Sequence, residues 1–177
     1  FELLLRLYIQ VSPPIRYSIY KINPERYTLD THHLVTISSY CLMPNQFHFC
    51  VKQDVNGGIL LLMRKLLNSY SHYYRIRYNT KGALFESVFK AIQIETDEQL
   101  IHLTRYHHLN PVTAHLVDQP QNYPFSSYQI YLGKKSDLID TTYILSQFRS
   151  RKEYEKFVLD QKDYQRKLNK IRHIIME

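Results

Sequence analysis

The sequence predicts an α+β fold, in which an antiparallel sheet packs against helices and a helical C-terminal tail follows. Residues 33–43 and 47–53 are rich in β-forming residues, and Pro44-Asn45 lies between them, which is typical of two strands joined by a turn. Between residues 59 and 78 the apolar side chains recur at three- and four-residue intervals, which indicates an amphipathic helix. Strand and helix signals thus alternate along one chain, and this alternation places it in the mixed class.

The N-terminal half supplies one more helix. Residues 1–10, FELLLRLYIQ, have the pattern of a helix that ends before Pro13-Pro14. Residues 15–31 are polar and irregular. Asn56-Gly57-Gly58 is expected to form the loop before the amphipathic helix.

The C-terminal half is expected to begin with a strand. Residues 88–95, VFKAIQIE, follow a turn at Gly82 and are rich in β-formers. Thr96 is a candidate N-cap, and the helix after it should end near Asn110, because proline disfavours helical geometry in the residue before it.

Two further helices are expected in the C-terminal tail, over residues 143–148 and about 152–175. We therefore expect a main domain over residues 1–132 and a basic helical tail over 133–177. Residues 147–177 contain nine Lys or Arg and five Asp or Glu, so this part of the chain has a net charge of +4.

Composition narrows the class of protein. The chain has 177 residues, 44% of them apolar, and a formal net charge of +7, which favours a polyanionic partner and nucleic acid in particular. The 16 tyrosines among these cations suit single-stranded nucleic acid, whose bases stack on aromatic rings. A basic surface without such a partner is the alternative. The longest apolar run is five residues, far short of a membrane span, and two cysteines give no disulfide framework.

The segment YCLMPNQFHFC, residues 40–50, contains a candidate metal site. Gln46 and His48 are two residues apart, so on a strand their side chains would lie on the same face, with Phe47 on the other. An amide and an imidazole on one face are either ordinary surface groups or two of the three side chains that hold a metal ion.

Four segments resemble the single-tyrosine HUH transposases, and within them the REP-associated branch. YCLMPNQFHFCV is similar to that family's strand, turn and strand ending in His-hydrophobic-His. GALFESVFKA resembles its Gly-x-Leu-Phe strand entry, and YPFSSY its Tyr-Pro-Trp-Ser-Ser-Tyr loop. LTRYHHLNPVTAHLV resembles its Arg-Tyr-Ile-x-Leu-Asn-Pro-Val-x-Ala helix. Together the four cover about residues 40–130, in the family's order.

The resemblance implies a ferredoxin-like or RRM-like sheet, a divalent cation (Mg²⁺ or Mn²⁺), and cleavage of single-stranded DNA through a 5′-phosphotyrosine link. Such a sheet requires a strand before the first helix, and we expect that this strand is either missing or lies upstream of Phe1. The family's nucleophile corresponds to Tyr106 and its third metal ligand to Asn110. These positions are i and i+4, so they share one face of a helix. Without the motif, Tyr106 is one of 16 tyrosines, Asn110 a helix-capping residue, and His48 a surface histidine.

Gln46 departs from the family pattern, which has His at this position. A site of His48, Gln46 and Asn110 would offer one nitrogen and two neutral oxygens, which suits Mg²⁺ or Mn²⁺ better than zinc. Gln46 is then either a working but weaker ligand or the mark of a decayed or domesticated enzyme. His107 and His108 follow the nucleophile and point elsewhere on the helix, so we assign them structural or DNA-facing roles and do not expect them to be metal ligands.

Four basic residues near these motifs are expected to contact phosphates: Arg105, Lys90, Arg64 and Lys65. The alternative is that they form a solvated basic surface without a ligand. The implied partner is single-stranded DNA that contains a hairpin, with no membrane, in the cytoplasm and associated with the nucleoid. The long tail favours a monomer.

Three functions compete. The first is a metal-dependent DNA endonuclease and strand transferase. The second is a domesticated protein of the same descent that binds hairpin or single-stranded DNA without cutting it. The third is an RNA-binding module, which ranks last because the chain lacks the RRM RNP1 signature.

Overall fold

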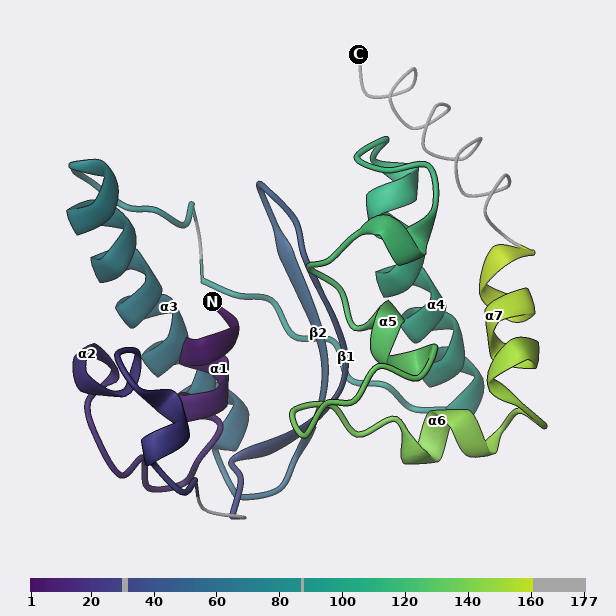
Figure 1. The fold of residues 1–177 in the computed structure, drawn as a ribbon, viewed down its shortest axis with the longest axis horizontal. Helices are drawn as coiled ribbons and strands as arrows, with labels where there is room; N and C mark the ends of the chain where they lie inside the picture. Colours follow the sequence, from purple (N-terminus) through teal and green to yellow (C-terminus); the bar gives the residue numbers. More distant parts are fainter. Residues whose placement is uncertain (30–31, 87, 161–177) are drawn as a thin grey trace. The chain divides into compact units, whose positions relative to one another are not determined.

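A computed structural model describes residues 1–29, 32–86 and 88–160 (Figure 1). The chain forms two compact units. Among the described residues, unit 1 comprises residues 1–29, 32–36, 52–86 and 88–92, and unit 2 comprises residues 37–51 and 93–160. Each unit is described by itself below.

An antiparallel hairpin of two strands runs through both units. Strand β1 is Val35–Leu42 and strand β2 is Phe47–Gln53, as the sequence predicts. The N–H of Met43 donates to the carbonyl oxygen of Gln46 at 2.7 Å, which closes the turn over Pro44-Asn45. Together with the helices, this sheet confirms the predicted α+β class.

Unit 1 is built on two helices. Helix α1 (Glu2–Tyr8) confirms the predicted N-terminal helix, and α3 (Gly58–Tyr78) confirms the predicted amphipathic one. The two are linked by a hydrogen bond from the Ser69 hydroxyl to the Tyr8 oxygen at 2.9 Å. The short helices α2 (Tyr17–Tyr20) and η1 (Pro24–Arg26) complete the unit. Its apolar core includes Leu4, Leu5, Leu7, Leu62, Met63 and Leu66.

The predicted strand at residues 88–95 is wrong. The described residues of this segment form neither helix nor strand, and Val88 and Ile92 are 84% and 92% exposed. A run of β-forming residues becomes a strand only where it pairs with the edge of another strand and buries side chains in a core. The side chains of Val88 and Ile92 are exposed, so no core buries them here. The sheet of the described residues therefore has two strands, fewer than the resemblance implies.

The described part of unit 2 contains five helical segments, of which α4 (Asp97–Thr113) is the longest. The others are η2 (Pro120–Asn122), α5 (Tyr128–Tyr131), α6 (Thr142–Ser146) and α7 (Arg151–Leu159). The second edge of β1 is paired here. Leu42 N–H donates to the Phe125 carbonyl at 2.9 Å, and Ser127 N–H to the Tyr40 carbonyl at 3.0 Å. Residues 125–127 therefore lie antiparallel to this edge.

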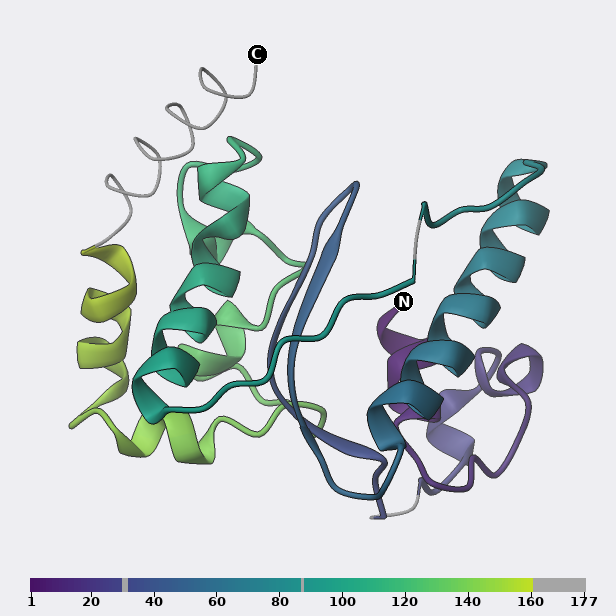
Figure 2. The same ribbon diagram turned by 180° about the vertical axis from the view of Figure 1, so that it is seen from behind.

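A buried polar network fastens α7 to α4, which lie side by side in Figures 1 and 2. His108 is fully buried, with its Nε2 2.8 Å from Ser127 Oγ and its Nδ1 2.7 Å from the Tyr154 oxygen. Tyr154 also stacks on Tyr131, with ring centroids 4.8 Å apart. The part of the expected tail up to residue 160 thus packs into unit 2. The predicted division of the chain between residues 132 and 133 differs from the boundaries of these units, and it stays a prediction.

Helix α4 begins where the sequence predicts but ends later. Helix α4 begins as predicted, because the Thr96 hydroxyl accepts from Gln99 N–H at 3.2 Å. Its predicted end at Asn110 is wrong, since the helix continues through Pro111 to Thr113. Proline costs one backbone hydrogen bond, but residues 107–112 are all buried, and this packing outweighs the loss. The predicted helix over 152–175 is seen up to Leu159, and its remainder lies outside the described residues.

Candidate functional site

Tyr106 and His48 come together in unit 2. Tyr106 lies on α4, and its ring meets the imidazole of His48 on β2 edge to face, with centroids 5.7 Å apart. Tyr106 is 38% exposed, so its ring is not part of the core. Within the described residues its hydroxyl has no hydrogen-bond partner. The sequence-predicted nucleophile is therefore reachable from solvent and lies beside a sequence-predicted metal ligand.

His48 has an unused buried nitrogen. Its Nε2 is shielded from solvent and has no hydrogen-bond partner in the described part of the chain. Burial lowers the pKa of this imidazole below its usual value, because the charged form loses hydration. Strand alternation puts Phe47 and Phe49 on the opposite face, where their rings are 5.6 Å apart. The neutral imidazole is the form that a metal ion binds.

His107 is the residue whose place sequence reasoning missed. It is 2% exposed, and its ring stacks on His48 with centroids 5.6 Å apart and an interplanar angle of 29°. Its Nδ1 and Ser39 Oγ on β1 share a hydrogen bond at 2.9 Å. Burial, and then the neighbouring His48, lower the pKa of His107 to about 3. A helical wheel places His107 about 100° from Tyr106 but cannot show that a strand some 60 residues earlier faces it.

Asn110 is buried one turn beyond Tyr106. It is 6% exposed, and its Nδ2 has no hydrogen-bond partner among the described residues. The capping alternative fails, because α4 continues for three residues beyond it. The atom without a partner is an N–H donor, whereas a cation would bind the amide oxygen, so the role of Asn110 as a ligand stays a prediction.

Gln46 lies in the turn and makes a different contact. Its side chain is exposed, and its Nε2 donates to Met43 Sδ at 3.6 Å. Strand alternation predicts a shared face only within a strand, and β2 begins at Phe47. The structure thus gives Gln46 a contact across the turn and none with His48, so its predicted role as a ligand stays a prediction.

The donor groups are an incomplete match to a common metal centre. The described residues hold no cluster of three or more His, Cys, Asp or Glu side chains arranged to share a metal ion. The predicted set has only one member of that kind, His48, with two amides beside it. A neutral imidazole with a free nitrogen and a buried amide are nevertheless groups that can bind a divalent cation.

The four predicted phosphate contacts have different surroundings. Arg105 packs under α7, with its guanidinium carbon 4.3 Å from the centroid of the Phe157 ring, and burial lowers its pKa. Arg64 is exposed and Lys65 half-buried, both on α3 in unit 1. Lys90 is exposed on the extended segment before α4. Three of the four can therefore meet a ligand without rearrangement, while Arg105 already has an aromatic partner.

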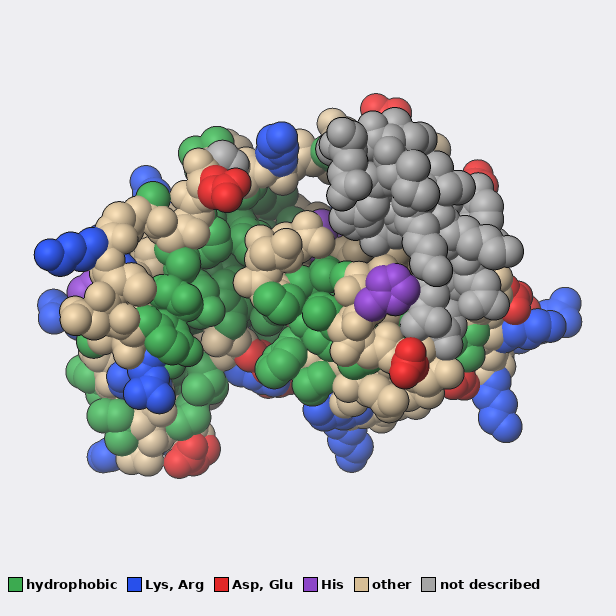
Figure 3. All heavy atoms as spheres, turned by 90° about the horizontal axis from the view of Figure 1, so that it is seen from above, with side chains coloured by type: hydrophobic (Ala, Val, Ile, Leu, Met, Phe, Trp, Pro, Cys, Tyr) green, Lys and Arg blue, Asp and Glu red, His purple; other side chains and the backbone are tan. Residues whose placement is uncertain are grey.

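The second half of α3 combines aromatic rings with positive charge. Tyr70, Tyr74 and Tyr78 are spaced by four residues, and the last two have ring centroids 4.5 Å apart. Tyr73 and Tyr78 are 41% and 58% exposed. Residues 55–85 include no Asp or Glu but five cations, Arg64, Lys65, Arg75, Arg77 and Lys81. Figure 3 shows Lys and Arg side chains around hydrophobic surface at the left, where α3 lies. We call residues 64–81 the basic tyrosine face.

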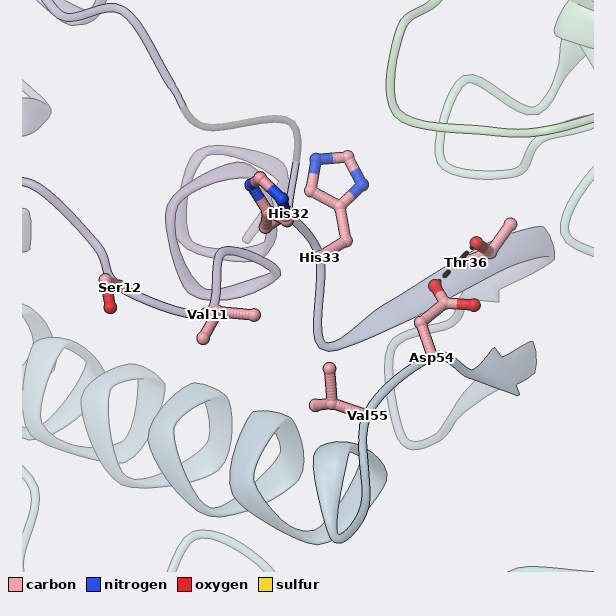
Figure 4. A pocket seen from close by; sticks show the side chains of 7 residues that line it. All are labelled: Val11, Ser12, His32, His33, Thr36, Asp54 and Val55. Atoms are coloured by element: carbon pink, nitrogen blue, oxygen red, sulfur yellow. Dashed lines mark hydrogen bonds between the residues drawn. The ribbon is translucent and has the colours of Figure 1, made fainter.

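A cavity of about 640 Å³ lies within unit 1, lined by Val11, Ser12, His32, His33, Thr36, Asp54 and Val55 (Figure 4). The Thr36 hydroxyl donates to Asp54 Oδ2 at 2.7 Å, and Lys52 lies 3.7 Å from the other oxygen of that carboxylate. The acid is thus already paired, and none of the predicted site residues lines this cavity.

Comparison with known proteins gives no family assignment. No family model, no curated protein and no solved structure matches the chain. The resemblance to HUH transposases therefore rests on the four motifs alone. In the described ranges, no helix combines the length and apolar character needed to cross a bilayer.

Proposed function

We propose that this protein is a metal-dependent single-stranded DNA endonuclease and strand transferase with Tyr106 as its nucleophile. The observation that carries the proposal is the pairing of Tyr106 with His48. A half-exposed tyrosine with an unbonded hydroxyl lies 5.7 Å, ring to ring, from an imidazole whose buried Nε2 has no partner in the described chain. The quoted motifs supply the reaction class.

The reaction begins with attack of the Tyr106 oxygen on the phosphorus of a phosphodiester. The P–O3′ bond breaks, a 5′-phosphotyrosine forms, and the phenolic proton passes to water while the leaving 3′ oxygen takes up a proton. In the reverse direction a 3′-OH attacks the phosphotyrosine and rejoins DNA. The number of phosphoester bonds is conserved, so strand transfer needs no nucleotide cofactor.

A divalent cation, Mg²⁺ or Mn²⁺, would polarise the scissile phosphate and stabilise the charge that develops on it. His48 and Asn110 are the predicted ligands that lie buried in unit 2, and Gln46 is the third predicted ligand. Burial lowers the pKa of His48, which favours the neutral imidazole, the form that binds a cation.

The DNA would be held mainly through its phosphates and bases. The net charge of +7 supports binding to a polyanion, and the basic tyrosine face offers rings on which unpaired bases can stack. A strand that contains a hairpin is the substrate class implied by the resemblance, in the cytoplasm and with the protein acting as a monomer.

A domesticated DNA-binding protein is the second candidate. It is favoured by the position of Gln46, whose amide contacts Met43 across the turn. Such a protein would retain the basic tyrosine face and bind DNA without forming a covalent link.

The two candidates are separated by incubating the protein with a library of single-stranded hairpins and Mn²⁺, followed by a denaturing gel. An adduct that survives denaturation supports the enzyme. Binding on a native gel with no adduct supports the DNA-binding protein.

A further inference from the structure

The stacked pair of His48 and His107 includes one buried ring nitrogen, on His48, that has no hydrogen-bond partner in the described chain. Both rings lie in unit 2, their centroids are 5.6 Å apart, and His107 is 2% exposed. Buried polar groups in folded proteins are nearly always hydrogen-bonded, and each exception calls for a physical reason. The Nε2 of His48 is such an exception among the described residues.

The bond to Ser39 determines which nitrogen of His107 is available. Ser39 Oγ is fully buried and engages Nδ1 at 2.9 Å. Metal-binding histidines commonly donate one ring N–H to such a partner, which fixes the tautomer and turns the other nitrogen toward the ion. When Nδ1–H donates to Ser39, the lone pair of His107 is on Nε2.

The two imidazoles lie in direct contact, one on β2 and the other on α4. Two neutral imidazoles in contact form a donor pair that Gln46 cannot offer, since it is exposed in the turn and contacts Met43.

We propose that His107, rather than Gln46, joins His48 in holding a divalent transition metal ion, with Asn110 as the third side chain. This inference rests on the metal-dependent function proposed above and changes its ligand set from one imidazole to two. Two nitrogen donors favour a borderline ion such as Co²⁺ over Mg²⁺, which prefers an all-oxygen shell.

Metal binding is measured on the full chain without DNA, with Co²⁺ followed by its visible absorption and Mn²⁺ by electron paramagnetic resonance. His48→Ala and His107→Ala should each weaken Co²⁺ binding at least tenfold. Ser39→Ala leaves both rings in place but removes the partner of Nδ1, and should weaken binding by roughly tenfold. Gln46→Ala should bind within about twofold of the unchanged protein, as should His72→Ala, a control on the exposed surface of α3.

A second measurement needs no variant and so does not depend on how well His107→Ala folds. In ¹⁵N-labelled protein, Zn²⁺ should shift the Nε2 resonances of His48 and His107 together, at one equivalent of metal. Shifts in His48 alone, no shift in either ring, or loss of Co²⁺ binding in Gln46→Ala but not in His107→Ala would each overturn the inference.

The two proposals can fail separately. Co²⁺ bound through His48 and His107, with no adduct on DNA that binds, would uphold the metal site and refute the strand transferase. An adduct that forms with unchanged Mn²⁺ dependence in His107→Ala would refute the role of His107 and uphold the transferase.

Discussion

The imidazole of His48 on β2 meets the ring of Tyr106 on α4 edge to face, with centroids 5.7 Å apart, although 58 positions separate them in the chain. The contact joins the predicted metal ligand on the strand to the predicted nucleophile on the helix inside one compact unit. A phosphate bound at His48 would lie near the tyrosine, as the mechanism implied by the resemblance to HUH transposases requires.

The basic tyrosine face should contribute to binding single-stranded DNA. Replacing Tyr73 and Tyr78 together by Ser removes two exposed rings while leaving all five cations. We expect the free energy of binding to an unstructured single strand to weaken by roughly 1–3 kcal/mol for each base that no longer has a ring to stack on. Fluorescence anisotropy with labelled DNA measures this.

Ile76→Ser is the matched control, since Ile76 is 70% exposed on the same helix and offers no ring for stacking. If Ile76→Ser weakens binding as much as the tyrosine pair does, the face acts through general apolar contact, and base stacking is not its role.

The C-terminal residues should set part of the salt dependence. Residues 161–177 contain five Lys or Arg and two Asp or Glu, a net charge of +3. Truncation after Asp160 keeps Tyr154 and its contacts in unit 2, unlike a cut near residue 133. For single strands, the slope of log K against log salt should become shallower by about 0.7 for every phosphate that these cations neutralise. An unchanged slope across the salt titration would mean that they do not bind DNA phosphates.

Tyr154→Phe should destabilise unit 2. Ser127 Oγ donates to the Tyr40 carbonyl at 3.3 Å, so it can accept from His108 Nε2–H, and Nδ1 then accepts from the Tyr154 hydroxyl. Removing that hydroxyl leaves a buried nitrogen without its donor, at a cost of roughly 1–3 kcal/mol in the free energy of unfolding. Urea denaturation measures it. Tyr143→Phe, at a ring that is 49% exposed, is the control and should change the free energy by less than about 0.5 kcal/mol.

Stability should fall in mild acid. The pKa of His107 is lowered to about 3, and that of His108 is lowered well below its usual value of 6.5, in both cases mainly by burial. Below pH 6.5 the unfolded chain therefore binds protons that the folded chain does not, and the free energy of unfolding decreases as pH falls from about 6.5 toward about 3.

Each of these histidines contributes a slope of at most about 1.4 kcal/mol per pH unit. His107→Phe keeps a ring on His48 but cannot titrate, so the pH dependence in mild acid should become shallower in urea melts. A His107→Phe curve parallel to that of the unchanged protein would show that His107 is protonated in the folded state.

Local patterns predict most of the elements but not their contacts. The strands of the hairpin, α3 and the Thr96 cap depend on residues close in sequence, and each is found as predicted. The β-formers at residues 88–95 form no strand, because strand formation also depends on a neighbour that sequence alone does not place.

In the candidate site too, the sequence predicts local features, whereas contacts between distant residues are seen only in the fold. The motif indicates His48 and Tyr106, which the structure brings together. Sequence reasoning gives His107 a role outside the site, because its partner Ser39 is 68 residues away and only the fold joins them. Strand alternation predicts that Gln46 shares a face with His48, but the turn ends that alternation one residue before β2 begins.

The central claim is tested most directly by the covalent adduct itself. The full chain is incubated with a single-stranded hairpin DNA that it binds, labelled on the 3′ side of the cleavage point, with Mn²⁺, and resolved on a denaturing gel. The account predicts a labelled protein band that maps to Tyr106 by peptide mass spectrometry. The band should be absent in Tyr106→Phe and present in Tyr143→Phe, with DNA affinity within about twofold in both, since each change removes one hydroxyl. An adduct that persists in Tyr106→Phe, or no adduct on bound DNA across the hairpin library, would contradict it.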